Sequence, residues 1–91
     1  MVTKKATIKN SAGIHLRPSG IIMKAIEQYE GRVRLGNGTT LLEADHIMSI
    51  IALGLCEGDF VTIQVEGPNE TEIAEELVIL FQTHFDFPPR D

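Results

Sequence analysis

The stretch Gly13-Ile14-His15-Leu16-Arg17-Pro18-Ser19 joins a strand-like segment to a helical pattern, and the elements on either side of it set the order of the fold. In residues 2–8, before this junction, Val2, Ala6 and Ile8 fall on one side and polar residues on the other. This alternation has the period of a half-buried strand. The sequence therefore predicts a first strand that runs directly into the junction.

A helix is predicted immediately after the junction. Pro18 suits its first turn because the N–H that proline lacks has no partner inside the helix there. Gly20 weakens such a helix by roughly 1 kcal/mol relative to alanine, so a small residue at this position suits an exposed contact surface near His15. The helix is expected to end at Glu30-Gly31. Its expected buried face, at helical spacing, is Ile21, Ile22, Ala25, Ile26 and Tyr29.

Two short strands, residues 32–35 and 40–43, flank the sequence Gly36-Asn37-Gly38-Thr39. Asn-Gly between two strands is a strong hairpin signal, through a type I′ turn with positive φ at both central residues. A short helix is expected over residues 47–53, ended by Gly54. The sequence therefore places a hairpin and a short helix after the first helix.

The last two elements are a strand over residues 60–66 and a final helix. Val61, Ile63 and Val65 are expected to face inward from the strand. Asn69 is the expected N-cap of the helix, with Glu72 at the third helical position. The expected buried face of this helix consists of Ile73, Leu77, Leu80 and Phe81.

The predicted order is β-α-β-β-α-β-α, which is typical of a two-layer α+β fold. Amphipathic strands in this order favour a four-stranded, mainly antiparallel sheet with three helices on one face. The 91 residues suffice for one domain over 1–91, with an irregular tail at 86–91.

Composition excludes several classes of protein. No stretch approaches the roughly 20 apolar residues needed to span a bilayer, and the first residues lack the apolar core of a secretory signal. The single cysteine, Cys56, cannot form an intramolecular disulfide, which favours a cytoplasmic protein. Aromatic residues are scarce and no dense Lys/Arg stripe is present, which argues against nucleic-acid binding.

Charge is strongly segregated along the chain. Residues 1–42 hold seven basic and two acidic residues, a net charge of +5, whereas residues 43–91 hold one basic and eleven acidic residues, a net charge of −10. A basic first half is suited to docking on acidic protein partners.

The junction itself is a candidate anion site. A helix start offers unpaired N–H groups and the positive end of the helix dipole. Arg17 adds a guanidinium whose planar donors match phosphate oxygens. The residues therefore suggest that the imidazole of His15 accepts and holds a phosphoryl group. A polar residue in an ordinary loop is the alternative for His15.

Two motifs and the element order resemble HPr, the family of histidine-containing phosphocarrier proteins of the phosphoenolpyruvate-dependent phosphotransferase system. The first motif is residues 13–18, GIHLRP, which resembles the family's active-site signature. The second is residues 45–54, DHIMSIIALG, which resembles its second helix. The resemblance covers about residues 2–85 and implies an open-faced β-sandwich.

The resemblance also implies the function. Phospho-Enzyme I would phosphorylate His15 on Nδ1, and the group would pass to a histidine of a IIA domain during sugar uptake. Arg17 would help to hold and release the phosphate. A protein of this kind is a phosphocarrier and not an enzyme, needs no cofactor or metal, and is expected to be a monomer. The expected partner-binding surface is Leu16, Gly20, Ile47, Met48 and Ile51.

His46 departs from the family pattern because it stands where many members have a regulatory serine. Control by a serine kinase at this position is therefore not expected. The interpretation of His46 without a functional role is a solvent-facing residue near a helix start. Two other functions stay open: a regulatory carrier of the nitrogen branch, suggested by Gly67-Pro68 and residues 78–86, and a non-phosphorylated binding module on the same fold.

Overall fold

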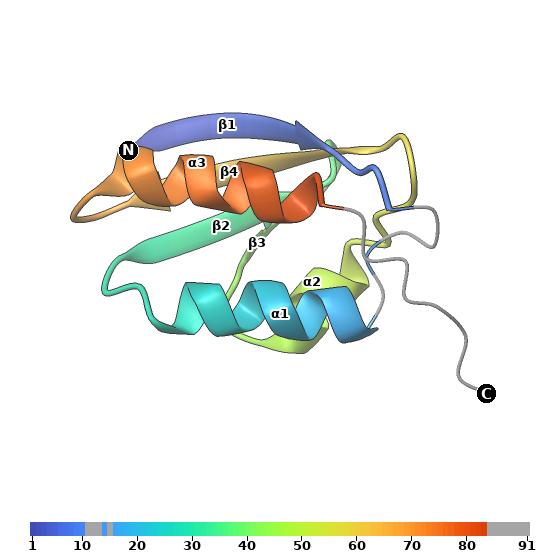
Figure 1. Ribbon diagram of the computed structural model, residues 1–91, viewed down its shortest axis with the longest axis horizontal. Helices are drawn as coiled ribbons and strands as arrows, with labels where there is room; N and C mark the ends of the chain where they lie inside the picture. Colours follow the sequence, from blue (N-terminus) through green and yellow to red (C-terminus); the bar gives the residue numbers. More distant parts are fainter. Residues whose placement is uncertain (11–13, 15, 84–91) are drawn as a thin grey trace.

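A computed structural model of the chain describes residues 1–10, 14 and 16–83, with only the backbone described at Leu16. Its elements follow the predicted order (Figure 1). They are β1 (Val2–Thr7), α1 (Leu16–Glu27), β2 (Arg32–Gly36), β3 (Leu41–Glu43), α2 (Ile47–Ala52), β4 (Phe60–Glu66) and α3 (Glu70–Phe81). The tail predicted at 86–91 lies outside the described residues.

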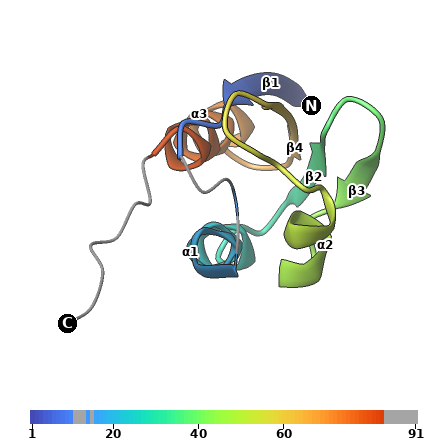
Figure 2. The same ribbon diagram turned by 90° about the vertical axis from the view of Figure 1, so that its right-hand side faces the viewer.

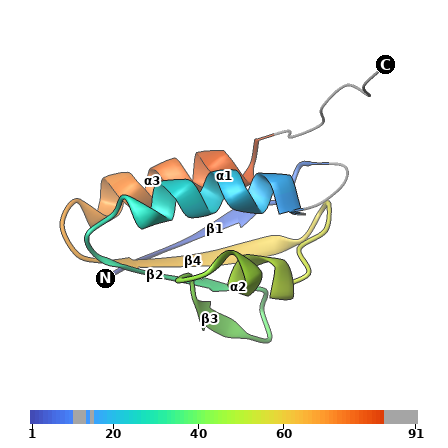
Figure 3. The same ribbon diagram turned by 90° about the horizontal axis from the view of Figure 1, so that it is seen from below.

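The four strands form one antiparallel sheet in the order β1-β4-β2-β3. The three helices lie on one side of this sheet, and its other side is uncovered (Figure 2). Helices α1 and α3 run side by side over the sheet (Figure 3). The predicted α+β class and the open-faced arrangement are both confirmed.

The core lies between the sheet and the helices. Val61, Ile63 and Val65 of β4 are fully buried, as predicted from their alternation. They are covered by apolar residues from each helix, of which Ile22, Ile50 and Phe81 are all 0% exposed. Burying one such side chain stabilises the fold by roughly 1.5–3 kcal/mol, so this central strand and the three helices stabilise one another.

The buried face of α1 differs from the prediction by part of a turn. Ile22 and Ile26 are buried as expected, but Ile21 is 41% exposed and Ala25 is also exposed. Met23 is buried instead. Adjacent apolar residues leave the phase of a helix undetermined, and the buried side of α1 lies on Ile22, Met23 and Ile26.

The hairpin between β2 and β3 closes differently from the prediction. Asn37 does not have positive φ, so the turn is not type I′. The loop has four residues, and Asn37 Oδ1 accepts hydrogen bonds from the N–H groups of Thr39 and Thr40 at 3.0 and 2.9 Å. Asn37 also donates from Nδ2 to the Leu53 carbonyl at 3.0 Å. A contact with the end of α2 therefore sets the turn.

The start of α3 is also capped differently. Asn69 occupies the N-cap position with φ 52° and makes no side-chain cap hydrogen bond, so the predicted capping role is wrong. Instead the Glu70 carboxylate accepts a hydrogen bond from the Gly67 N–H at 3.2 Å and another from the Met1 ammonium at 3.0 Å. On the buried face of α3, Leu77 and Phe81 are as predicted, Ala74 is buried, and Ile73 and Leu80 are half-buried.

Candidate functional site

The structure defines the chain on both sides of the candidate histidine. His15 and residues 11–13 lie outside the described residues. Before it, Ile14 is buried, and its N–H donates to the Leu55 carbonyl at 2.9 Å. After it, α1 begins at Leu16. Position 15 therefore falls, in the sequence, between an anchored residue and the first residue of a helix.

The first turn of α1 has the features of an anion-binding helix start. It contains no acidic residue, and Arg17 is exposed. Pro18 is fully buried, as is Ser19, which is 0% exposed. The positive end of the helix dipole and the exposed guanidinium act on the same region, and both favour a negative group there.

Ser19 is a feature of this turn that the sequence pattern missed. Its Oγ is buried and has no hydrogen-bond partner in the described part of the chain. Leaving a hydroxyl buried and unpaired is costly, by about 1–3 kcal/mol. A serine at helical spacing from Ile22 carries no sequence signal that distinguishes a buried position from a solvated one.

Helices α1 and α2 meet beside this turn. A Cβ atom placed on Gly20 would lie 3.8 Å from Ile47 Cδ1, which is ordinary contact distance. On α2, Met48 is 56% exposed and Ile47 and Ile51 are half-buried, whereas Ile50 and Leu53 lie in the core. Gly20, Ile47, Met48 and Ile51 are named here the α1–α2 patch. The side chain of Leu16, the fifth residue expected on the partner surface, is outside the description.

His46 caps α2. Its backbone is extended, with φ −153° and ψ 145°, and its Nδ1 accepts a hydrogen bond from the Met48 N–H at 3.1 Å. The residue is exposed, which agrees with the expectation of a solvent-facing residue near a helix start. The capping bond itself was not predicted, because histidine is not among the usual N-cap residues.

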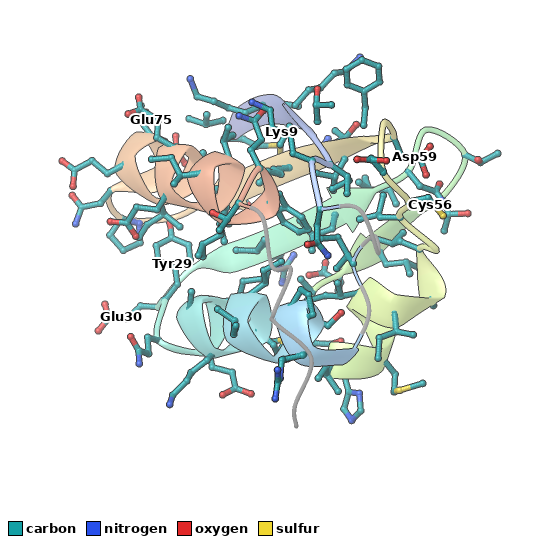
Figure 4. The ribbon with its side chains drawn as sticks, turned by 45° about the vertical axis from the view of Figure 1, so that its right-hand side comes forward. Lys9, Tyr29, Glu30, Cys56, Asp59 and Glu75 are labelled. Atoms are coloured by element: carbon teal, nitrogen blue, oxygen red, sulfur yellow. The ribbon has the colours of Figure 1, made fainter. Side chains whose placement is uncertain are left out.

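A shallow hollow of about 430 Å³ separates α1 from the start of α2. Its charged and polar lining consists of Lys24 and Glu27 from α1 and Asp45 and His46 before α2, and Gly20, Met23 and Ile47 complete it. In the described residues, no group of three or more His, Cys, Asp or Glu side chains is placed to hold a metal ion. Cys56 is exposed in the turn before β4 (Figure 4).

Two groups with shifted pKa values lie away from this region, at the start of α3. Hydrogen bonds from the Met1 ammonium and from the Gly67 N–H lower the pKa of Glu70. Tyr29 lies between α1 and the start of α3 (Figure 4), and burial, with a smaller effect from the nearby Glu70 charge, raises its pKa. These shifts bear on stability and not on the candidate site.

A comparison with protein-family models matches residues 2–83 to the family described as the PTS HPr component phosphorylation site. The chain belongs to the PTS HPr family. Two relatives illustrate its range. It is 31% identical to the phosphocarrier protein HPr of Treponema pallidum, over 94% of this chain and 98% of that protein. It is 29% identical to the phosphocarrier protein NPr of Klebsiella oxytoca, over 93% and 96% of the two chains.

Solved HPr structures have the same fold. The crystal structure of the phosphocarrier protein HPr from Bacillus anthracis superposes with a TM-score of 0.83 at 23% identity, covering 89% of this chain and 96% of that one. The predicted membership of the HPr family is thereby confirmed, and with it the function: HPr proteins are phosphocarriers of the phosphotransferase system and not enzymes. No helix in the described part of the chain has the length and apolarity to cross a bilayer.

Proposed function

We propose that His15 is the phosphoryl acceptor of this HPr protein. The phosphoryl group leaves phospho-Enzyme I and forms a P–N bond with Nδ1 of His15, and it then passes to a histidine of a IIA domain as that bond breaks. The position of His15, one residue before α1, carries this proposal, because a helix start stabilises the added negative charge. Phosphoryl transfer depends mainly on such positioning and charge stabilisation.

Arg17 is proposed to stabilise the phosphoryl group. The residue is exposed in the first turn of α1, two positions after His15. Its guanidinium is always charged and offers donors that match phosphate oxygens. No metal or cofactor on this protein takes part in the proposed transfer.

The α1–α2 patch is proposed to bind both partner proteins. Exposed apolar side chains beside charged ones are typical of protein interfaces. The patch combines the 56% exposed Met48 with Gly20 and Ile47, which line one shallow hollow. We include Leu16 in this surface, as its place in the family motif suggests. Because the two partners use one histidine in turn, the protein is proposed to act as a monomer, in the cytoplasm.

Sugar uptake is the proposed pathway, and the nitrogen branch is the second candidate. The match to a Klebsiella oxytoca protein named NPr favours the second candidate, since it extends over 93% of this chain. His46 stands at the position of the family's regulatory serine in either branch, so we propose that a serine kinase does not control this site. Ser49 carries the hydroxyl of α2 and lies three residues after His46. Its Oγ lies 3.5 Å from Asp45 Oδ1.

Incubation with Enzyme I, Mg²⁺ and phosphoenolpyruvate tests the acceptor. We expect an acid-labile, base-stable phosphate on the wild-type protein, none on His15→Ala, and full labelling of His84→Ala. Retained label on His15→Ala would show that His15 is not the acceptor. Labelling rates with the sugar-branch and nitrogen-branch forms of Enzyme I then identify the pathway, as the cognate form is expected to be the faster donor.

A further inference from the structure

We infer that His46 is a positioning residue for the docking of phosphoryl-transfer partners, because its neutral imidazole holds the first turn of α2 and with it the α1–α2 patch. The inference rests on the proposed function of that patch. The observation that carries it is the 3.1 Å hydrogen bond from the Met48 N–H to His46 Nδ1.

The bond joins the cap directly to the patch. Met48 is a large apolar residue of α2 that is 56% exposed, and its own N–H donates to His46 Nδ1. The next N–H, that of Ser49, donates to the His46 carbonyl at 2.9 Å. His46 thus satisfies two of the four free N–H groups at the start of α2.

The shortness of α2 makes this cap important. The helix has six residues, and an isolated helix of that length is not stable in water. Two interactions hold this helix. Ile50 packs in the core, and His46 caps the N-terminus. The cap acts on the first turn, where the exposed Met48 lies.

The bond requires a lone pair on Nδ1 of His46. Nδ1 uses its lone pair to accept from Met48, so the neutral ring carries its proton on Nε2. A doubly protonated imidazolium has no lone pair for the Met48 N–H.

The charged groups around His46 come from two elements. Lys24 and Glu27 face it from α1 across the shallow hollow, and Asp45 precedes it on its own segment. Asp45 Oδ1 lies 3.5 Å from Ser49 Oγ, so it is engaged with the same first turn. If Asp45 were able to replace His46 as the cap, removal of the imidazole would have no effect on α2, and the test below measures this.

Comparison of wild type, His46→Ala and His46→Asn distinguishes loss of the capping hydrogen bond from loss of the imidazole ring. Alanine cannot accept the hydrogen bond, whereas asparagine is among the best N-cap residues and does not titrate. We expect the KM of His46→Ala as a substrate of Enzyme I to rise by about 5-fold at most, with kcat unchanged. His46→Asn is expected to restore the wild-type KM.

Hydrogen exchange at the Met48 amide reports on the capping bond directly. Protection of this amide should be lower in His46→Ala than in wild type, because alanine offers no acceptor. His46→Asn should restore it.

Equal KM values and equal Met48 protection in all three forms would overturn the inference. Failure of His46→Asn to rescue His46→Ala would overturn it as well. Failure of the proposed function looks different: wild type would accept no phosphate from Enzyme I, while the exchange of the Met48 amide would still report on the cap.

Discussion

At the scale of single residues, the candidate site depends on a few residue types in the first two turns of α1. Arg17 supplies charge, Pro18 fits the first turn of the helix, and Gly20 leaves room beside Ile47. Each of these can be recognised in the sequence, because each residue type has a distinct physical effect. The burial of Ser19 and the capping bond of His46 cannot, because both depend on what surrounds them in the fold.

Gly20 allows a test at this scale. A methyl group fits there without a clash, so Gly20→Ala should stabilise the fold by about 0.5–1 kcal/mol through the greater helix propensity of alanine. If Gly20 is part of the partner surface, the same change should raise the KM for Enzyme I. Denaturant unfolding and transfer kinetics measure the two effects.

Ala25→Gly is the matched control, since Ala25 is exposed on the same helix. It should lower stability by a similar amount and leave transfer kinetics unchanged. An unchanged KM in Gly20→Ala would remove Gly20 from the proposed surface.

At the scale of elements, the start of α3 links the stability of the protein to pH. The pKa of Glu70 is lowered by the Met1 ammonium and by the Gly67 N–H. Its contribution to stability is therefore complete above its ordinary value of 4.5 and is lost as the pH falls through the lower, folded-state pKa. Glu70→Gln should weaken the dependence of stability on pH in acid.

Thermal unfolding below about pH 5 measures this effect. The comparison uses protein with a free Met1 amino group. Glu75→Gln, a change on the exposed side of the same helix, should keep the wild-type dependence. Equal acid dependence in wild type and Glu70→Gln would contradict the role of the Glu70 carboxylate.

At the scale of helices and strands, some features could be predicted from the sequence and others could not. Element order and the inward face of β4 were predicted correctly, because each has a clear period or a clear breaker. Of the α2 residues expected on the partner surface, Met48 is exposed, and Ile47 and Ile51 are half-buried. The phase of α1 was wrong because Ile21, Ile22 and Met23 are all apolar. The predictions at Asn37 and Asn69 were wrong, and in both regions the structure has contacts between residues far apart in the sequence, from Asn37 to the Leu53 carbonyl and from Met1 to Glu70.

At the scale of the whole molecule, two exposed basic residues lie on α1. These residues are Arg17 and Lys24, on the helix that carries Gly20 of the α1–α2 patch. On the strands, Arg34 and Arg32 lie 2.9 and 3.9 Å from Glu43. The acidic residues of the second half include Glu75 on α3, which lies on the opposite side of the molecule from Asp59 (Figure 4).

This distribution predicts that docking depends on salt. Attraction of Arg17 and Lys24 to an acidic partner is screened within about 10 Å at 0.1 M salt. The KM for Enzyme I should therefore rise several-fold on going from about 0.05 M to about 0.5 M salt.

Lys24→Gln should reduce this salt dependence. Lys5→Gln, on the strand pair β1–β4 opposite Thr62, should not. A KM independent of salt would contradict docking through the basic half.

The central claim is that His15 carries the phosphoryl group. The most direct measurement is ³¹P–¹⁵N NMR of the protein after phosphorylation by Enzyme I, with the modified residue mapped by mass spectrometry. We predict one phosphorus atom bound to Nδ1 of His15 and none on His46 or His84. A phosphate on another residue, or no phosphate at all, would contradict the account.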